Sequence, residues 1–588
     1  MSYQPPLEDM RFLLGAVVGL AEIAHLPGCA DATPELVGQV LEEGAKLAAN
    51  VLAPLYRSGD VEGSALENGV VRTPAGWTEA YRAFVDGGWP SVPFDQAHGG
   101  QGLPWIVATP LAEMWNAANL GFALCPMLTT GAAETLAAHG TPWQKSVLLP
   151  RLVSGEWTGT MNLTEPQAGS DLSAVRARAV PEGGHYRITG QKIFITYGEH
   201  EMAENIVHLV LARTPGAPEG VKGISLFAVP KRLVDAAGRL GGRNDLRCVR
   251  LERKMGIHAS PTCVMAYGDD GGAVGYLVGT ENRGLECMFT MMNNERLAVG
   301  LQGVAVADRA YQLARAYARE RRQGRDAATG EDRVPIVRHP DVRRMLMAMR
   351  ASAEAGRALC YEVAARLDTA RRHPDARVRA TNQALVDFLT PVVKSWCTDM
   401  GCEVASLGIQ VHGGMGFIED AGAAQILRDA RITPIYEGTN GIQARDLVGR
   451  KVLREGGETA RAFGAMVRQT ASALAGERAA MADALVRATG AFDEATAWLL
   501  EAGRGDSSGP AAAAVPYQRL VGVLAGGWMM ARAAEAAAMP DAALPQFRAG
   551  KAATARFFAE SLLPEVQSLA EIVRAGGGAA MALPDDQV

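Results

Sequence analysis

Arg428-Asp-Ala-Arg-Ile-Thr-Pro-Ile-Tyr-Glu-Gly-Thr-Asn-Gly-Ile-Gln443 is the run from which the rest of the chain can be interpreted. It places one carboxylate, Glu437, after an apolar and aromatic segment and just before a glycine-rich turn. A carboxylate among such neighbours loses hydration, so we expect its pKa to rise toward neutrality, as a general base requires. Gly438 and Gly441 would let the backbone approach a ligand closely. The alternative is an exposed glutamate that opens a loop.

Length, charge and cysteine content exclude several classes of protein. A chain of 588 residues is too long for a single core and predicts several domains. The net charge of −6 is spread without long blocks, which argues against a nucleic-acid partner. No signal peptide is visible, and we expect no run of the ~18 to 20 apolar residues that span a bilayer. The eight cysteines contain no CxxC pair, which predicts reduced thiols, no metal site and a cytoplasmic protein.

Changes in residue pattern predict five parts. They are a lead helix at 1–33, an N-terminal helical domain at 34–156, a β domain at 157–282, a helical bundle at 283–453 and an additional helical domain at 454–588. Thr33 is expected to cap a helix that begins at Pro34. Long apolar-striped segments at 342–368 and 380–407 are typical of a helical bundle. Residues 503–516 are predicted to form a flexible linker, and the tail after 576 to fray.

Short runs of β-type residues in the middle of the chain predict a small sheet or barrel. The expected strands are 158–164, 186–189, 192–196, 206–212, 224–229, 249–254, 264–267 and 274–278. The chain before Leu152 is expected to be helical, apart from a glycine-rich interruption at 87–102.

The run around Glu437 resembles the segment that carries the catalytic base in the acyl-CoA dehydrogenase family. Other parts of the chain, over roughly 87–453, resemble that family in the same order. The resemblance implies a mostly α fold with a central β domain: an N-terminal helical domain, a middle β-barrel and a C-terminal helical bundle. The helical pattern after 454 adds an extra C-terminal domain to this arrangement.

Five further motifs support the resemblance and imply bound FAD. Residues 161–171 resemble the flavin motif L/V-T-E-P-x-A-G-S-D, and residues 190–196 resemble G-x-K-x-W/F-I-T. Residues 320–325 and 410–417 resemble segments that hold the diphosphate end of the flavin bound mainly by a neighbouring subunit, while residues 254–262 resemble a structural marker. The cofactor-binding residues that these matches and the Glu437 run imply are Met161, Leu163, Thr164, Gly169, Ser170, Phe194, Thr196, Arg321, Gln323, Gln410, Gly414 and Thr439.

Each motif also has a plainer interpretation. Gly169 and Ser170 fit an ordinary turn, and Phe194 fits a core position in a strand. Gly324 stands where the family usually has Phe, and Gly441 stands where many members have Gln, so the contact that this Gln would make is absent. His412 is interpreted as a packing or loop residue.

Two carboxylates are candidates for the base. Glu437 matches the Tyr-Glu-Gly-Thr position, but Glu295 occupies the helix position that carries the base in the isovaleryl and long-chain subclasses. The alternative for Glu295 is a carboxylate at the start of a helix, facing its dipole. The resemblance also implies substrate contacts at Arg296, Tyr436 and Gly438.

The resemblance implies FAD-dependent α,β-dehydrogenation of an acyl-CoA thioester to the trans-2-enoyl-CoA. Glu437 would take the α-proton while a hydride passes from the β-carbon to the flavin, and an electron-transfer flavoprotein would receive the electrons. A homodimer or homotetramer is implied, with no membrane insertion.

The long lead and extension resemble the bacterial subgroup that acts on 3-methylmercaptopropionyl-CoA in dimethylsulfoniopropionate degradation. The alternatives are a fatty acyl-CoA dehydrogenase of broad chain length, an acyl-CoA oxidase or flavin monooxygenase, and a non-catalytic interaction protein.

Overall fold

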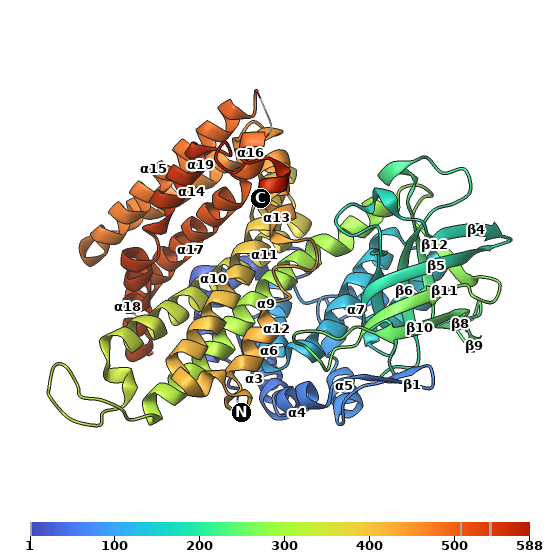
Figure 1. Ribbon diagram of the computed structural model, residues 1–588, viewed down its shortest axis with the longest axis horizontal. Helices are drawn as coiled ribbons and strands as arrows, with labels where there is room; N and C mark the ends of the chain where they lie inside the picture. Colours follow the sequence, from blue (N-terminus) through green and yellow to red (C-terminus); the bar gives the residue numbers. More distant parts are fainter. Residues whose placement is uncertain (1–2, 506–507, 540–543) are drawn as a thin grey trace. The chain divides into compact units, whose positions relative to one another are not determined.

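The computed structural model describes residues 3–505, 508–539 and 544–588. The chain divides into two compact units. The first unit comprises Met1–Pro5, Glu43–Leu103 and Met114–Glu295, and the second comprises Pro6–Glu42, Pro104–Glu113 and Arg296–Val588. Figure 1 shows that the first unit contains the β-sheet and that the second is helical.

The first unit is built on an eight-stranded sheet with the order β10-β11-β5-β12-β7-β6-β3, in which β4 also pairs with β5. The pairs are antiparallel except for β3 and β6, which run parallel. The bounds of these strands are β3 Thr158–Asn162, β4 Arg178–Glu182, β5 His185–Thr196, β6 Ile206–Ala212, β7 Ser225–Pro230, β10 Leu246–Leu251, β11 Thr262–Tyr267 and β12 Ala273–Val278.

Both faces of this sheet are buried at β6. Along β6, Val207 and Leu209 belong to one hydrophobic cluster, while Val210 and Ala212 belong to another. Successive side chains of a strand point to opposite faces, so the two clusters lie on opposite sides of the sheet. This explains why β6 is a continuous apolar run without alternation, as in strands buried on both faces.

Helix α7 (Leu120–His139) packs on β3 within the first unit. By length and composition alone α7 could cross a membrane, so the prediction that no run is apolar enough is wrong. Of its most apolar window, 78% is buried inside the protein. Burial of this kind is typical of a core helix, and it accounts for the apolar composition. The other helices of the first unit are α4 Leu55–Glu62, α5 Trp77–Asp86 and α8 Leu149–Ser154.

The second unit is a helical bundle to which the C-terminal helices are added. The bundle contains α10 Pro340–Arg372, α11 Ala376–His412, α12 Ala423–Ala430, α13 Asn440–Asp446 and most of α9 Gly284–Glu320. The added helices are α14 Glu458–Ala473, α15 Ala479–Ala502, α16 Ser508–Ala512, α17 Ala514–Ala538, α18 Pro545–Ser561 and α19 Glu565–Ala575. Shorter or shared helices are α1 Leu7–Phe12, α2 Leu20–Ala24, α3 Pro34–Leu47 and α6 Trp105–Ala118.

The C-terminal extension packs on the bundle through α17, which lies against α10 and α11. The approach is close because α17 presents glycines: a Cβ on Gly522 would lie 2.4 Å from Trp396 of α11. Gln518 of α17 also donates a hydrogen bond of 2.9 Å to the carbonyl of Pro391 in α11.

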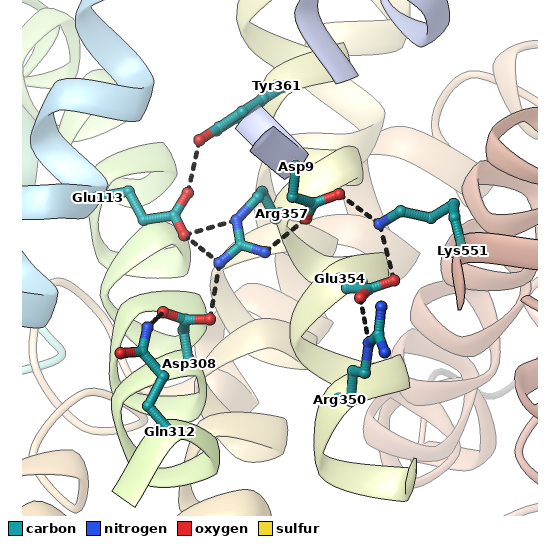
Figure 2. Close-up of polar contacts among 9 residues, drawn as sticks. All are labelled: Asp9, Glu113, Asp308, Gln312, Arg350, Glu354, Arg357, Tyr361 and Lys551. Atoms are coloured by element: carbon teal, nitrogen blue, oxygen red, sulfur yellow. Dashed lines mark hydrogen bonds and ion pairs between the residues drawn. The ribbon is translucent and has the colours of Figure 1, made fainter. Parts of the chain in front are cut away.

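A buried ionic network ties α1, α6, α9, α10 and α18 together within the second unit (Figure 2). Its centre is Arg357, whose guanidinium lies 2.7 Å from Asp9, 2.7 Å from Glu113 and 3.1 Å from Asp308. Lys551 of α18 pairs with Asp9 and lies 2.7 Å from Glu354. The network therefore joins the N-terminal lead and the C-terminal extension to the same helix, α10.

Burial raises the pKa of Glu113, although Arg357 opposes the rise. The pKa of Asp308 is raised for the same reason and against the same opposing cation. For Asp9 burial would also raise the pKa, but Lys551 and Arg357 together hold it below its usual range. The cations of the network thus oppose the rise in pKa that burial alone would give each of these acids.

Several expected elements differ in the structure. Residues 65–72, expected to be helical, form the hairpin β1 Ala65–Glu67 and β2 Val70–Arg72, whose turn is Asn68-Gly69 with positive φ at both residues. Asn-Gly is a strong hairpin signal that the helical pattern around it concealed. Strands β4, β8 (Arg232–Val234) and β9 (Leu240–Arg243) were also not predicted, and 185–196 is one strand rather than two. The predicted linker at 503–516 is wrong over 508–512, which forms α16, and over 514–516, where α17 begins.

Other local predictions are confirmed. The Oγ1 atom of Thr33 accepts a hydrogen bond of 3.2 Å from the backbone N–H of Leu36, as expected of the residue that caps α3. All eight cysteines are free thiols.

Candidate active site

The two flavin-motif segments of the first unit lie side by side. The hydroxyl of Thr160 donates to the carbonyl of Thr196 at 2.7 Å, and the N–H of Ile193 donates to the carbonyl of Thr164 at 2.9 Å. These bonds fasten the end of β3 to the end of β5. The structure therefore brings the predicted residues Met161, Leu163 and Thr164 next to Phe194 and Thr196.

A buried ion pair anchors the loop between these segments. Lys192 of β5 donates to the carbonyl of Leu163 at 3.0 Å and to the carboxylate of Glu165 at 2.8 Å. Glu165 also accepts backbone hydrogen bonds from Arg176 and Ala177, at 2.8 and 3.0 Å. The sequence analysis gave neither residue a role, although a lysine at a buried strand position is the signal that could have found this pair.

Lys192 and Glu165 each shift the pKa of the other. Burial lowers the pKa of Lys192 to about 8, against the attraction of Glu165. Burial would raise the pKa of Glu165, but Lys192 and the two backbone N–H groups hold it below its usual range. Below about pH 8 the pair is therefore ionised on both sides and fixes the start of the loop at residues 163–165.

The exposed surface beside the ion pair of Lys192 and Glu165 fits a flat aromatic cofactor with a phosphate chain. Phe194 is 60% exposed and has a φ of 60° although it lies in β5, so it is not the core residue that the plainer interpretation suggested. Gly169 has nothing within 4 Å of a would-be Cβ, and Ser170 is exposed. An exposed ring next to an open Gly-Ser turn suits stacking and backbone donation to a phosphate.

Lys192→Met is expected to weaken flavin retention. The substitution leaves the Glu165 carboxylate buried without its cation, which typically costs about 3–5 kcal/mol and releases the loop. The flavin absorbance per polypeptide after gel filtration measures the effect. The neighbouring exposed residue supplies the matched variant, Gln191→Met, which is expected to retain its flavin.

In the unmodified protein, flavin retention is expected to fall as the pH rises through about 8, since Lys192 then loses its proton. Equal retention by both variants, independent of pH, would contradict this role.

The remaining flavin-motif residues lie at one end of the second unit. Arg321 and Gln323 follow the last residue of α9, and Gln410 and Gly414 lie at the end of α11. The ring of Tyr317 on α9 stacks on His412 of α11 with centroids 4.5 Å apart, so the two helix ends are neighbours. Arg321 donates to Gln323 at 3.2 Å, and all four predicted residues are exposed. His412 is a packing residue, as expected.

Glu437 sits in a strained turn. Its φ is 56° and that of Gly438 is 85°, so two consecutive residues adopt left-handed conformations. For a residue other than glycine such a conformation costs about 1–3 kcal/mol. Gln443 opposes this cost by donating to the carbonyls of Glu437 and Gly438, at 3.3 and 3.5 Å. Thr439 accepts from the N–H of Ile442 at 3.3 Å and so caps α13.

The neighbours of Glu437 differ in part from the expected apolar surroundings. Ile435 is exposed, while Tyr436 is half-buried and its hydroxyl donates to the buried Gln302 of α9. Arg296 is buried and lies 3.7 Å from Asp446 of α13. Burial lowers the pKa of Arg296, although Asp446 and Glu437 oppose the shift. Arg296 and Glu437 are thus close enough to interact electrostatically.

Glu295 is a buried residue well inside a helix. Helix α9 begins at Gly284, so the alternative interpretation of Glu295 as a carboxylate at the start of a helix is wrong. The carboxylate is 1% exposed and packs against α7, with its Oε1 3.0 Å from a would-be Cβ on Gly131. Favourable interaction with an N-terminal dipole cannot account for a carboxylate at this position.

Lys394 and Asn440 are residues near Glu437 that the sequence analysis missed. Lys394 is fully buried on α11 and donates to the side-chain oxygen of Asn440 at 2.8 Å. Its signal in the sequence is a single charge within the apolar run Val392-Val393-Lys394-Ser395-Trp396.

Comparison with known proteins finds four family descriptions along the chain. "Acyl-CoA dehydrogenase, N-terminal domain" matches residues 39–156, "Acyl-CoA dehydrogenase, middle domain" matches 160–269 and "Acyl-CoA dehydrogenase, C-terminal domain" matches 282–453. "Acetyl-CoA dehydrogenase C-terminal like" matches 463–584, which is most of the C-terminal extension.

Individual proteins are similar over nearly the whole chain. A 3-methylmercaptopropionyl-CoA dehydrogenase of Ruegeria pomeroyi is 49% identical over 96% of this chain and 97% of its own length. A broad-specificity linear acyl-CoA dehydrogenase, FadE5, of Mycobacterium tuberculosis is 35% identical over 97% of both chains. The solved structure of a Bacillus anthracis acyl-CoA dehydrogenase complexed with FAD has the same fold, with a TM-score of 0.74 and 19% identity over 98% of this chain and 92% of that one.

Proposed function

Because this chain belongs to the acyl-CoA dehydrogenase family and is a FAD-dependent enzyme of its long subgroup, we propose that it converts 3-methylmercaptopropionyl-CoA to the trans-2-enoyl thioester. The observation that carries this substrate is the 49% identity, over 96% of the chain, to a protein with that activity in its name. Another short- or medium-chain acyl-CoA is the second candidate. The mycobacterial relative named for broad specificity toward linear acyl-CoAs favours it.

Glu437 is the proposed general base, which removes a proton from the α-carbon of the thioester. A thioester α-proton is too weakly acidic for a free carboxylate at neutral pH, so the developing enolate needs a hydrogen-bond donor. The backbone N–H of Glu437 is proposed to donate to the thioester oxygen, and such a donor is typically worth about 3 kcal/mol of barrier. The left-handed φ at Glu437 and Gly438 sets the direction of this part of the backbone. Arg296, Tyr436 and Gly438 are proposed to contact the substrate.

The proposed flavin contacts divide between two groups of residues. Met161, Leu163, Thr164, Phe194 and Thr196 would contact the ring, with Gly169 and Ser170 beside the phosphates and Thr439 as a further contact. Arg321, Gln323, Gln410 and Gly414 would hold the diphosphate end. Bound FAD supplies the oxidising power, by accepting the hydride that leaves the β-carbon as the double bond forms.

The remaining partners are proposed from the family resemblance. An electron-transfer flavoprotein would reoxidise the enzyme, and a homodimer or homotetramer in the cytoplasm is proposed for the assembly. The domain boundaries at 33, 156, 282 and 453 also stay predictions.

Steady-state turnover with a panel of acyl-CoA thioesters tests this proposal. The panel contains 3-methylthiopropanoyl-CoA, butyryl-CoA, octanoyl-CoA and palmitoyl-CoA, with an artificial electron acceptor and a parallel oxygen electrode. We expect the highest kcat/KM for 3-methylthiopropanoyl-CoA and negligible oxygen uptake. A preference for octanoyl-CoA or palmitoyl-CoA would identify the protein as a fatty acyl-CoA dehydrogenase. Oxygen uptake at the rate of turnover would identify an oxidase.

A further inference from the structure

Lys394 stands out as a buried charge beside the proposed base. A lysine ammonium is among the groups most costly to remove from water, and a buried position that needed only packing would be filled by Leu or Met. The side chain of Lys394 is fully buried, and its ammonium donates to Asn440 at 2.8 Å. The structure therefore retains a charge where packing alone does not require one.

Asn440 connects this ammonium to the turn that carries Glu437. Its backbone N–H donates to the carbonyl of Pro434 at 3.0 Å, which closes the turn around Glu437. Its side-chain amide donates to Asp399 at 2.8 Å and to the hydroxyl of Thr398 at 3.1 Å. Asn440 thus fixes the turn through its backbone N–H and the position of the ammonium on α11 through its side chain.

The charges around Lys394 come from three elements. Glu437 on the turn and Asp399 on α11 attract its ammonium, and Arg296 on α9 repels it. Arg296 is itself engaged by Asp446, which also lies 3.2 Å from Arg450.

One further group belongs to this electrostatic environment. Arg519 of α17 acts on Asp399 and pairs with Glu403 and Glu565. Lys394 and Arg296 are thus two cations whose charges act on Glu437, and of these Arg296 also lies 3.7 Å from Asp446.

We propose that Lys394 is a positioning residue for Glu437: its ammonium, tethered by Asn440 to the turn that carries Glu437, keeps that carboxylate in its ionised, proton-accepting form. The inference rests on the proposed role of Glu437 as the base. An apolar acyl group next to Glu437 would favour the protonated carboxyl, which cannot accept the α-proton. The ammonium opposes this effect.

The titration of Lys394 agrees with this role. Burial lowers the pKa of Lys394 to about 7, while Glu437 and Asp399 oppose the shift. The ammonium is therefore present on the acidic side of neutrality, where Glu437 would otherwise take up a proton.

The test is the pH profile of kcat/KM for Lys394→Gln and Lys394→Met, measured in a Glu295→Gln background so that one candidate carboxylate is removed. Gln can still donate to Asn440 but carries no charge, whereas Met loses both. We expect both substitutions to move the acidic limb upward by about one pH unit or more, which is the effect of removing one nearby opposite charge. The plateau at high pH should be retained, because a less stabilised carboxylate is a stronger base.

Lys551→Met supplies the matched control, since Lys551 is another fully buried lysine of the second unit. It is expected to lower Tm and to leave the acidic limb in place. If Lys394→Gln lowers the plateau without moving the limb, Lys394 is only structural and the proposal is wrong.

Glu437→Gln is measured alongside to separate the two claims. Turnover that survives in Glu437→Gln would overturn the base itself. An inactive Glu437→Gln together with an unmoved limb in Lys394→Gln would overturn only the role of Lys394.

Discussion

Glu437→Gln is expected to lower kcat by about 10²- to 10⁴-fold, the usual contribution of a general base. Glutamine has nearly the same shape and can preserve the left-handed turn, but it cannot accept the α-proton. The loss should appear in kcat and kcat/KM together, since the interaction is made only in the transition state. Steady-state kinetics at the best substrate measure it.

Glu295→Gln is the control for this result. Both glutamates are long acidic side chains, and Glu295 is buried against α7. If Glu437 is the base, Glu295→Gln retains most of its turnover. A large loss in Glu295→Gln with little loss in Glu437→Gln would place the base on α9.

Arg357→Met is expected to lower the free energy of unfolding by about 3–5 kcal/mol, the cost of leaving a buried charge without its partner. The guanidinium is 2% exposed and contacts three buried carboxylates, those of Asp9, Glu113 and Asp308. In the variant, these three carboxylates would have to stay buried without the guanidinium or take up protons. Denaturant unfolding followed by circular dichroism measures the loss.

The pH dependence of the same variant provides a second test. Without the guanidinium, the folded-state pKa values of these acids rise above their unfolded values, so the unfolded state binds fewer protons than the folded state. The free energy of unfolding of the variant then falls as the pH rises through the pKa values of these acids. Its difference from that of the unmodified protein should therefore shrink toward pH 4. Arg344→Met, on the same helix and in a largely exposed pair with Asp341, is expected to change stability little. An equal effect of both substitutions would contradict the account of the network.

The fold could be predicted where one local signal dominates. The apolar run of β6 was predicted with its observed bounds of Ile206–Ala212, and Thr33 caps the helix where predicted. The hairpin at 65–72 was missed although the dipeptide Asn68-Gly69 is typical of a hairpin turn. The helical pattern on both sides led to the prediction of a helix there. The interpretation of Glu295 as a carboxylate at a helix start was wrong because α9 already begins at Gly284, as the predicted start of the helical bundle at 283 implied.

The polar contacts could not be predicted, because they join residues far apart in the sequence. Arg357 meets Asp9 across 348 positions and Glu113 across 244. The pair of Lys192 and Glu165 spans 27 positions and that of Lys394 and Asn440 spans 46. The motifs identified which segments form the site. The partners of the buried lysines that anchor those segments became visible only from the packing of strands and helices.

The most direct test of the central claim is anaerobic flavin bleaching in a single turnover. Purified unmodified protein, Glu437→Gln and Glu295→Gln are each mixed with 3-methylthiopropanoyl-CoA, and the flavin absorbance is followed in a stopped-flow instrument. The account predicts rapid bleaching of the unmodified protein and of Glu295→Gln, and bleaching slowed by about 10²- to 10⁴-fold in Glu437→Gln. A yellow, FAD-loaded protein that no acyl-CoA bleaches would contradict the proposed reaction, and equally rapid bleaching of Glu437→Gln would contradict the proposed base.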